Sequence, residues 1–417
     1  MKDAPSYQLE MMRAGHDINL ISLFGTKIYL FYNQEAVKEV LLTKAKFFNK
    51  GMALNNAKAL IGENILSSDG DDHIKRRKDL SKVFSKAFVT RFELEINTLM
   101  SNHVESLDGG KINTEDFFTK ISMDIISVLL FGQKLDTQMK VIDESLQDAL
   151  KLIAYMSVPG YKKLLWLPLP HHIKYRRAIS NIQKISSDLV STNSKKDNNG
   201  AIGILLNAGC SPDEINDQML ALFLAGHETT ATVMTWILYI SIKDNLITDE
   251  ILESISTCYE ESILYENLES QPIIKAFIYE MLRLYPPVWN IGRKVIEDVE
   301  ISGVKLKTGD YLSLSPYTSQ RSEKNFDNAE NFDLNRWLDS NGKFLKPNQF
   351  AYFPFSLGTR NCIGKILAET EIYTIIKHLF YHYDFELMSQ PDVKSKGLIT
   401  LKPDREIKIK LNKRSKT

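Results

Sequence analysis

The sequence predicts a mainly α-helical fold with a minor β-sheet region, built as a single domain over residues 1–417. Apolar residues recur at helical spacing over most of the chain, whereas β-like segments occur only before Gln34 and after Pro287. One helix in the middle of the chain is apolar nearly all round, which is typical of a helix buried in a protein core. These observations indicate a helical protein organised around a long central helix.

Composition limits the possible functions. Hydrophobic residues make up 43% of the chain and charged residues 25%, which is an ordinary globular balance. Lys and Arg together number 52, as do Asp and Glu, so no net charge favours nucleic acid as a partner. The first residues contain neither a membrane-spanning apolar run nor a signal-peptide pattern, so we expect a cytoplasmic protein without a transmembrane anchor. Cys210, Cys258 and Cys362 are too few and too scattered for a disulfide framework.

The first elements are expected to be two strands followed by helices. The segments INLISLF and KIYLFYN are β-like and flank a turn at Gly25 and Thr26. From Gln34 to about Leu150 the apolar spacing becomes helical. The polar stretch 191–200 predicts an exposed loop between helices, because helical spacing resumes directly after it.

The central helix has the clearest boundaries. Ser211 is a good N-cap residue, Pro212 fits the first turn, and Glu214 completes a capping box. Apolar residues then continue to about Lys243, which predicts a rod of roughly 45–50 Å.

The last third of the chain returns to mixed structure. A helical pair is expected over about Asp249–Leu284 and ends before Pro286. The β-rich segment VIEDVEISGVKLKTGDYLSLS follows, with turns at Gly303 and Gly309. A last helix is expected to begin near Ile363, and the stretch GLITLKPDREIKIKL is expected to close the chain as a hairpin.

One cysteine lies in a segment that suits metal chemistry. The segment FSLGTRNCIG places Cys362 between Gly358 and Gly364, two residues after Arg360 and at the start of an amphipathic helix. A helix N-terminus and a nearby positive charge favour a thiolate over a thiol, and glycines permit tight turns. A thiolate is the ligand with which a haem iron promotes O–O cleavage. The alternative for a single cysteine is a buried, inert thiol.

The segment resembles the haem-binding loop F-x-x-G-x-R-x-C-x-G of the cytochrome P-450 superfamily. The resemblance implies that haem b is the cofactor and that Cys362 is the axial ligand of its iron. It also implies that Arg360 pairs with a haem propionate and that Phe355 and Gly358 belong to the cofactor-binding loop. The resemblance covers nearly the whole chain and fits a soluble bacterial-type member. The residues of the loop resemble those of the microsomal and fatty-acid-hydroxylase branch more than those of the camphor-type bacterial branch.

A second motif, AGHETT, lies in the middle of the central helix. A glycine there costs roughly 1 kcal/mol relative to alanine, and an acid in an apolar helix costs more unless it is paired. Threonine can bond back to a helix carbonyl and open a local groove. The motif resembles [A/G]-G-x-[D/E]-T-T, which implies that Glu228 and Thr229 are catalytic and relay protons to oxygen at the haem. The alternative is a packing glycine beside a solvent-facing glutamate.

Further residues are expected to hold the haem-side core. Glu280 and Arg283 stand at i,i+3 and face the same side of a helix. They resemble the E-x-x-R pair of the family, and Arg336 in FDLNRW resembles its third partner, although Leu334 stands where the family usually has proline. The resemblance implies a structural role for all three.

Other cations are expected to contact the cofactor. His73 and Arg77 stand at i,i+4 and resemble the [W/H]-x-x-x-R pair of the family. Arg293 stands where the family places another propionate-binding arginine. Taken alone, each of these side chains would be interpreted as a charged group exposed to solvent.

The resemblance implies a monooxygenase that uses O2 to hydroxylate or otherwise oxidise a lipophilic fatty acid, terpenoid or polyketide-like compound. Two alternatives stay open: a peroxide-driven peroxygenase on the same fold, and a non-catalytic haem sensor or carrier. An enzyme that dehydrates or couples its substrate rather than hydroxylating it also stays open. The apolar segment WLPLP, which begins at Trp166, could contact a membrane, but we expect it to cover a substrate channel. The residues expected to line the substrate pocket are Ala225, Val288, Trp289 and Ile291.

Electrons are expected to come from a separate protein. The chain contains no G-x-G-x-x-G segment after a strand, so it has no recognisable nicotinamide- or flavin-binding motif. We expect a ferredoxin or flavodoxin, with its reductase, to dock on a basic surface near the thiolate. That surface would comprise the run Lys75, Arg76, Arg77 and Lys78, with Lys82 and Lys86 on the same helix, and Lys365.

Overall fold

The computed structural model describes residues 3–23, 25–107, 109–135, 139–156, 158–193, 200–259, 268–388 and 392–414. Helices dominate it, as the sequence predicts. The α-helices are α1 (Ala4–Arg13), α2 (Gln34–Lys38), α3 (Met52–Ile61), α4 (Gly70–Leu80), α5 (Lys86–Arg91), α6 (Glu93–Glu105), α7 (Thr114–Phe131), α8 (Met139–Tyr155), α9 (Pro170–Asn193), α10 (Ala201–Asn207), α11 (Pro212–Lys243), α12 (Asp249–Cys258), α14 (Pro272–Leu284), α15 (Pro316–Ser319) and α16 (Lys365–His382).

The strands and short helical turns fill the connections. The strands are β1 (Ile18–Leu23), β2 (Thr26–Phe31), β3 (Phe48–Lys50), β4 (Gly110–Asn113), β5 (Ile291–Val295), β6 (Val299–Ile301), β7 (Val304–Leu306), β8 (Tyr311–Leu314), β9 (Tyr383–Leu387), β10 (Ser395–Gly397), β11 (Leu401–Pro403) and β12 (Lys408–Lys413). The short turns are η1 (Glu39–Thr43), η2 (Ala45–Phe47), η3 (Tyr161–Leu164), η4 (Leu334–Trp337) and η5 (Gly358–Arg360).

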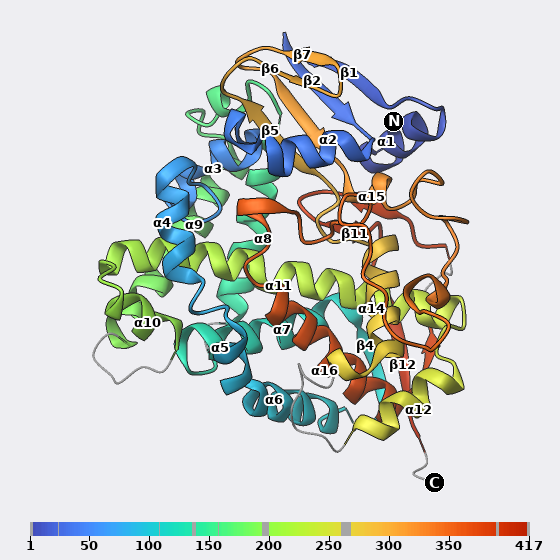
Figure 1. The fold of residues 1–417 in the computed structure, drawn as a ribbon. Coiled ribbons are helices and arrows are strands. Elements are labelled where there is room, and N and C mark those ends of the chain that lie inside the picture. The colour runs from blue at the N-terminus through green and yellow to red at the C-terminus, as the bar shows by residue number, and fades with distance from the viewer. Residues whose placement is uncertain are drawn as a thin grey trace.

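The largest sheet joins strands near the N-terminus to strands between residues 291 and 314. Its strand order is β1-β2-β8-β5-β3, and β2 pairs with β8 in parallel while the other neighbours are antiparallel. Figure 1 shows the blue N-terminal strands beside the orange strands of the last third, at one end of the molecule. The predicted hairpin before Gln34 and the predicted β-rich segment after Pro287 therefore belong to one sheet.

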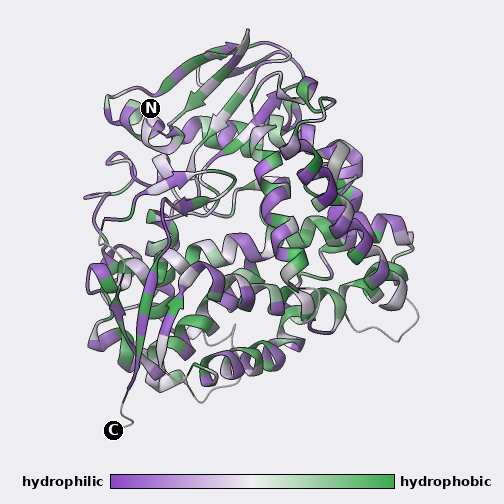
Figure 2. Ribbon diagram, turned by 180° about the vertical axis from the view of Figure 1, so that it is seen from behind, coloured by the Kyte–Doolittle hydropathy of each residue, from purple (hydrophilic) through white to green (hydrophobic). Residues whose placement is uncertain are grey.

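Helix α11 has the predicted boundaries. Ser211 accepts a hydrogen bond from the backbone N–H of Glu214, and the Glu214 side chain bonds back to the Ser211 backbone, which confirms the capping box. The helix has 32 residues and buries most of its side chains. It crosses the middle of the molecule in Figure 1 and packs against α7, α9 and α16. Figure 2 shows hydrophobic and hydrophilic residues mixed along the outer helices, as expected for amphipathic elements.

Two sequence-based expectations differ from the structure. The predicted terminal hairpin is wrong: β10 pairs with β11, whereas β12 pairs with β9 and β4. Pro403 ends β11, since proline cannot donate to a strand ladder, and the chain then turns toward another sheet. The expected loop 191–200 is also shorter at its start, because α9 continues to Asn193; residues 194–199 lie outside the described part of the chain. Among the described helices, none is both long enough and apolar enough to span a bilayer.

Candidate active site

The loop before α16 is shaped by a glycine and a backbone hydrogen bond. Gly358 has a φ of +71°, and a Cβ at this position would lie 2.1 Å from the carbonyl oxygen of Leu41. Any other residue here would strain the loop and collide with backbone. The backbone N–H of Cys362 donates to the carbonyl of Phe355 at 2.8 Å. The loop therefore returns on itself and presents Cys362 just before the helix.

Cys362 combines an exposed side chain with a crowded surrounding. Cys362 is exposed as a residue. The protein atoms around its sulfur nevertheless desolvate the thiol and raise its pKa, whereas the backbone of Gly364 and the charge of Arg77 lower that pKa. The sequence predicted that the helix N-terminus and an arginine would favour the thiolate. In the protein alone burial outweighs both, and a coordinated cation would reverse that balance.

Two buried cations face each other across a strand pair next to this loop. Lys50 in β3 is the register partner of Arg293 in β5, and both side chains are buried. Burial, together with the charges of Arg360 and Arg293, lowers the pKa of Lys50 to about 7. Burial also lowers the pKa of Arg293 to about 10. Asp69 is the one carboxylate that opposes these shifts, and it pairs with Arg360 at 3.0 Å.

Helix α4 supplies two more side chains to the same loop. His73 Nε2 lies 3.4 Å from the carbonyl oxygen of Thr359, and Arg77 Nη1 donates to the carbonyl of Asn361 at 2.8 Å. Burial lowers the pKa of His73 to about 4, so its ring is neutral at neutral pH. The predicted i,i+4 pair therefore contacts the residues that flank Cys362.

This charge distribution fits a haem. Lys50, Arg77, Arg293 and Arg360 gather around the Cys362 loop with Asp69 as their one acidic neighbour in the described contacts. Buried cations without counter-charges are costly, and the two propionates of a haem would supply those counter-charges.

Lys50 was not predicted, and its unusual surroundings are visible only in the folded chain. The lysine follows the buried Phe48 and precedes Gly51, where a Cβ would lie 2.9 Å from the backbone of Gly292. A lysine between a buried strand and a close backbone contact is unusual enough to mark a functional position.

The AGHETT segment of α11 separates its acid from its alcohol. Ala225, Gly226 and Thr229 are half-buried, and the Thr229 hydroxyl donates to the carbonyl of Ala225 at 2.9 Å. A Cβ on Gly226 would lie 3.1 Å from Ile126, so the glycine permits close packing of α7. The back-bond is the interaction expected of a threonine in a helix, whereas the local groove stays a prediction.

Glu228 is buried and faces the C-terminal segment. Its Oε1 accepts a hydrogen bond from the Thr400 hydroxyl at 2.8 Å and lies 3.5 Å from the ammonium of Lys402. Lys402 also pairs with the half-exposed Glu115 at 2.8 Å. The expected pair facing one groove is therefore not seen directly: Thr229 bonds to its own helix, while Glu228 joins a chain of polar groups that leads toward Glu115. No pattern in the sequence pointed to Thr400 or Lys402.

The residues expected to line a substrate pocket lie in different surroundings. Val288 is 36% exposed, and Ala225 is half-buried on α11. The Trp289 indole donates to the carbonyl of Leu398 at 2.8 Å, and its ring belongs to a small buried cluster. Ile291 lies in β5 within the core of the five-stranded sheet. Packing alone accounts for the last two.

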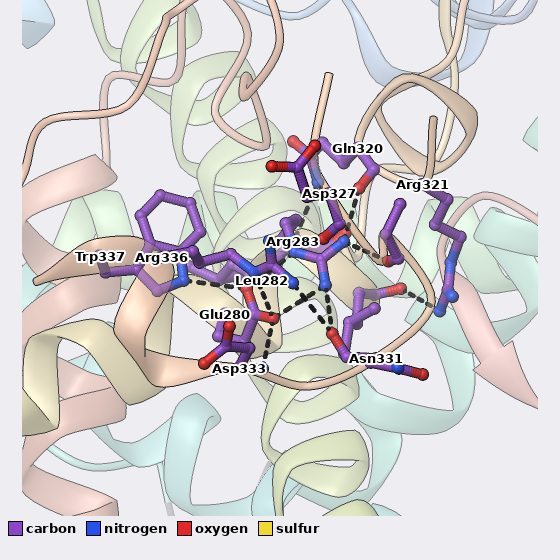
Figure 3. Close-up of polar contacts among 12 residues, drawn as sticks. Glu280, Leu282, Arg283, Gln320, Arg321, Asp327, Asn331, Asp333, Arg336 and Trp337 are labelled. Atoms are coloured by element: carbon purple, nitrogen blue, oxygen red, sulfur yellow. Dashed lines mark hydrogen bonds and ion pairs between the residues drawn. The ribbon is translucent and has the colours of Figure 1, made fainter. Parts of the chain in front are cut away.

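Glu280 and Arg283 form the fully buried centre of a polar cluster (Figure 3). The Arg283 guanidinium donates to Glu280 through Nε at 2.7 Å and Nη2 at 2.8 Å. It also donates to the carbonyls of Gln320, Ala329 and Asn331, at 2.7, 2.5 and 3.0 Å. One arginine thus ties α14 to the long connection that precedes the Cys362 loop.

The predicted third arginine joins the same cluster. Arg336 Nε donates to Glu280 Oε1 at 3.0 Å, so the leucine at position 334 does not prevent the contact. The Trp337 indole N–H donates to Glu280 Oε2 at 2.9 Å, and the backbone N–H of Asp333 donates to Oε1 at 2.9 Å. The sequence did not indicate these last two partners.

The expected basic surface is more divided than the sequence suggested. The prediction that Lys82 and Lys86 continue the helix of Lys78 is wrong, because α4 ends at Leu80 and Lys86 begins α5. Ser85 caps α5 by accepting from the N–H of Phe88, so the chain starts a new helix there. All three lysines are exposed.

Ion pairs occupy other members of that surface. Lys75 lies 3.5 Å from Glu214, and Arg76 lies 3.6 Å from Glu63. Lys365 lies 3.6 Å from Glu369 and is 46% exposed.

Comparisons with known proteins agree with this geometry. A family model described as Cytochrome P450 matches residues 6–411. The chain is 24% identical to a pentalenene oxygenase of Streptomyces avermitilis, over 100% of this chain and 94% of that protein. It is 25% identical to a cyclooctat-9-en-7-ol 5-monooxygenase of Streptomyces melanosporofaciens, over 89% and 83%, and 24% identical to human cytochrome P450 4V2, over 92% and 80%. A crystal structure of the cytochrome P450DA heme domain has a TM-score of 0.86 at 19% identity and covers 100% of this chain and 94% of that one.

Proposed function

The chain belongs to the cytochrome P450 family and is a monooxygenase with haem b as its cofactor, and we propose that it oxidises a lipophilic fatty acid, terpenoid or polyketide-like compound. The observation that carries the proposal is the exposed Cys362 side chain in a loop that Arg77 and Arg360 adjoin, next to the buried cations Lys50 and Arg293. Two relatives are named after pentalenene and cyclooctat-9-en-7-ol, whose names denote a hydrocarbon and an alcohol.

We propose that the residues around Cys362 hold the cofactor. When bound, haem b supplies the iron at which oxygen is activated. Cys362 would ligate that iron through its sulfur, while Gly358 and Phe355 keep the loop in shape. Arg360 and Arg293 would pair with the propionates and so lose the cost of burial without a counter-charge.

Three more side chains would complete the set of residues around the haem propionates. We propose that Lys50, His73 and Arg77 line it, because Lys50 lies 3.4 Å from His73 and both His73 and Arg77 contact the Cys362 loop. A neutral His73 would serve as a hydrogen-bond partner, whereas the two cations would supply charge.

We propose that Thr229 and Glu228 deliver protons in two stages. Glu228 exchanges protons with the outside through the polar chain formed by Thr400, Lys402 and Glu115. Thr229 holds the last proton at its hydroxyl, which the Ala225 carbonyl orients. A rotation of Glu228 away from Lys402 would join the two stages, since its Oε2 has no hydrogen-bond partner among the described residues.

We propose a substrate that contacts the helix face around Ala225, Gly226 and Thr229, which offers small side chains and one hydroxyl. The test is a series of substrate-binding difference spectra over fatty acids, terpenoids and polyketide-like compounds, followed by turnover with NAD(P)H and a reductase system. An apolar ligand should shift the Soret band and gain one oxygen atom.

The two alternatives predict different results in that assay. A peroxygenase would form the product equally well from hydrogen peroxide without reductant. A sensor or carrier would bind a ligand but form no product under either condition. Product formation that requires both oxygen and NAD(P)H would exclude both.

We propose a ferredoxin or flavodoxin as the electron donor, docking at the exposed lysines 78, 82, 86 and 365. Support comes from Arg77, which contacts Asn361 beside Cys362 and so places α4 next to the Cys362 loop. Opposite charges at such a surface speed association with an acidic partner. We also propose a cytoplasmic location, consistent with three cysteines that form no disulfide among the described residues.

A further inference from the structure

A cavity lies between α4, α10 and the first turns of α11. Its walls are side chains of α4, Leu205 of α10, Cys210, and Glu214 and Gln218 of α11. Figure 1 shows α4 beside α10 and the start of α11 at one side of the molecule. The cavity has a volume of about 60 Å³. Since a water-sized group needs about 10–15 Å³, there is room for roughly four to six heavy atoms.

The cavity is separate from the residues assigned to the cofactor, although it uses the same helix. Asp72, Arg76 and Asp79 line it and lie on one stripe of α4, because they are spaced by four and three residues. His73 and Arg77, which contact the Cys362 loop, lie on the neighbouring stripe. Helix α4 therefore faces the haem site with one stripe and this cavity with another.

Gln218 brings to the cavity a buried amide that lacks part of its partners. Its side chain is 4% exposed. Its Oε1 accepts a hydrogen bond from the backbone N–H of Ile65 at 2.9 Å, which fixes the end of the amide that carries the oxygen. The Nε2 group has no partner among the described residues. Because buried N–H groups are nearly always paired, an acceptor is expected in the cavity.

Arg76 presents a second donor of the same kind. Its Nε is buried and has no partner among the described residues, while its Nη2 lies 3.6 Å from Glu63. An arginine and an amide donor that line one cavity suit a carboxylate, because its two oxygens can accept from both.

Two carboxylates of α4 line the cavity as well. The ion pairs on this part of α4 use Lys75 and Arg76, and within the described part of the chain neither Asp72 nor Asp79 pairs with a cationic side chain. The Asp79 carboxylate lies 4.0 Å from the thiol of Cys210. The cavity thus offers negative charge to an ammonium group in addition to donors for a carboxylate.

We propose that this cavity binds a small α-amino acid. The carboxylate of the ligand would accept from Gln218 and Arg76, and its ammonium group would lie near Asp79. The buried side chains of Leu80 and Leu205 supply an apolar wall for a short side chain. Alanine, with its six heavy atoms, is within the roughly four to six that the volume allows.

The chemistry of the cavity favours an amino acid over a metal ion. Burial raises the pKa of the Cys210 thiol, and the charges of Asp79 and Glu214 raise it as well, so the sulfur is a neutral thiol rather than a thiolate ligand. Across the described residues, no group of three or more His, Cys, Asp and Glu side chains is arranged to hold a metal ion.

The first test is isothermal titration calorimetry of the haem-loaded protein with L-alanine, propionate and ethylamine. L-alanine should bind. Propionate has no ammonium group and ethylamine has no carboxylate, so each should bind at least about tenfold more weakly, because a charge-assisted contact is lost. Propionate that binds as tightly as L-alanine, or no heat at millimolar L-alanine, would overturn the proposal.

The second test places the ligand, because a thiol lines the cavity. L-alanine at ten times its dissociation constant should slow the alkylation of Cys210 by iodoacetamide about tenfold, as mass action requires. Mass spectrometry of the peptide that contains Cys210 measures this rate. Binding of L-alanine that leaves the alkylation rate unchanged would put the ligand elsewhere and contradict the assignment.

Two variants and two controls complete the experiment. Gln218→Glu keeps the oxygen that accepts from Ile65 but replaces the donor, so L-alanine should bind about tenfold or more weakly. Asp79→Asn should weaken binding by removing the charge near the ammonium group. Asn207→Asp on α10 and Asp71→Asn on α4 change exposed side chains outside the cavity and should leave binding unchanged. Unaltered affinity for L-alanine in Asp79→Asn and in a folded Gln218→Glu protein would rule the site out.

Discussion

Cationic side chains around Cys362 are the residues that most directly link sequence to cofactor. Arg77, Arg293 and Arg360 were predicted from their motifs, and the structure places all of them around the Cys362 loop. Lys50 was not predicted, because it lies far from the loop in sequence and meets it only through the pairing of β3 with β5. Burying these cations costs free energy that two propionates would offset.

Lys50→Met should therefore weaken haem retention. Transfer of haem to an acceptor apoprotein should become about tenfold faster, which corresponds to about 1.4 kcal/mol of lost binding. Lys46→Met changes an exposed lysine nearby and serves as the matched control. Equal transfer rates for both variants would show that Lys50 has no contact with the cofactor.

Thr229→Ala should leave haem content unchanged but reduce the product formed per NAD(P)H consumed. Its hydroxyl is oriented by the Ala225 carbonyl, and alanine leaves no group there to hold the last proton. Reductant should then be lost as hydrogen peroxide, measured alongside the product. Thr229→Ser retains the hydroxyl and should recover most of the coupling. Undiminished coupling in the alanine variant would contradict the proposed role.

Long-range polar contacts mark the limit of prediction at single residues. The motif suggested Glu228 and Thr229, but not that Thr400 and Lys402 would hold Glu228. Those partners lie in the C-terminal segment and reach the acid only after the chain has folded across α11. The spacing of residues within one motif does not indicate contacts with a segment so far away in the sequence.

Individual elements were predictable where their end signals are local. The capping box at Ser211 defined the start of α11, and Pro286 marked the end of α14 closely. The same kind of signal at Ser85, an N-cap that starts α5, was overlooked when Lys82 and Lys86 were assigned to the helix of Lys78. The prediction of a terminal hairpin was wrong for a different reason, because the pairing of a strand depends on which sheet has a free edge.

The α14 cluster predicts the largest effect of a single change on stability. Arg283→Ala should remove the arginine that donates to the carbonyls of Gln320 and Ala329 and should leave part of the Glu280 carboxylate without a donor, at a cost of about 3–5 kcal/mol. We expect little haem-loaded protein and a clearly lower melting temperature.

Arg336→Ala is the matched control for the cluster, because Arg336 is partly exposed and donates to Glu280 only through Nε. It should lower stability less than Arg283→Ala. Normal haem content and an unchanged melting temperature in Arg283→Ala would show that the cluster is not needed to form the haem-side core.

For the whole molecule, the basic surface near Cys362 should control electron supply. Reversal of Lys78, Lys82 and Lys365 to glutamate should slow the first electron transfer from a ferredoxin or flavodoxin, and added salt should slow transfer to the unchanged protein, because screening shortens to about 8 Å at physiological ionic strength. Stopped-flow reduction measures both effects.

Substrate affinity should not change in that variant, since the lysines lie on the outer face. Lys343→Glu with Lys346→Glu adds comparable charge elsewhere and should leave reduction unaffected. A rate that is indifferent to salt and to reversal of the three lysines would place the docking surface on another part of the protein.

The central claim, that Cys362 holds a haem iron through its sulfur, has one direct test. The purified protein is reduced, exposed to carbon monoxide, and its difference spectrum is recorded for the unchanged chain and for Cys362→Ser. We predict the red-shifted Soret band of a thiolate-ligated haem in the unchanged protein and little of that band in the variant. A histidine-type carbonyl spectrum from the folded, unchanged protein would contradict the assignment.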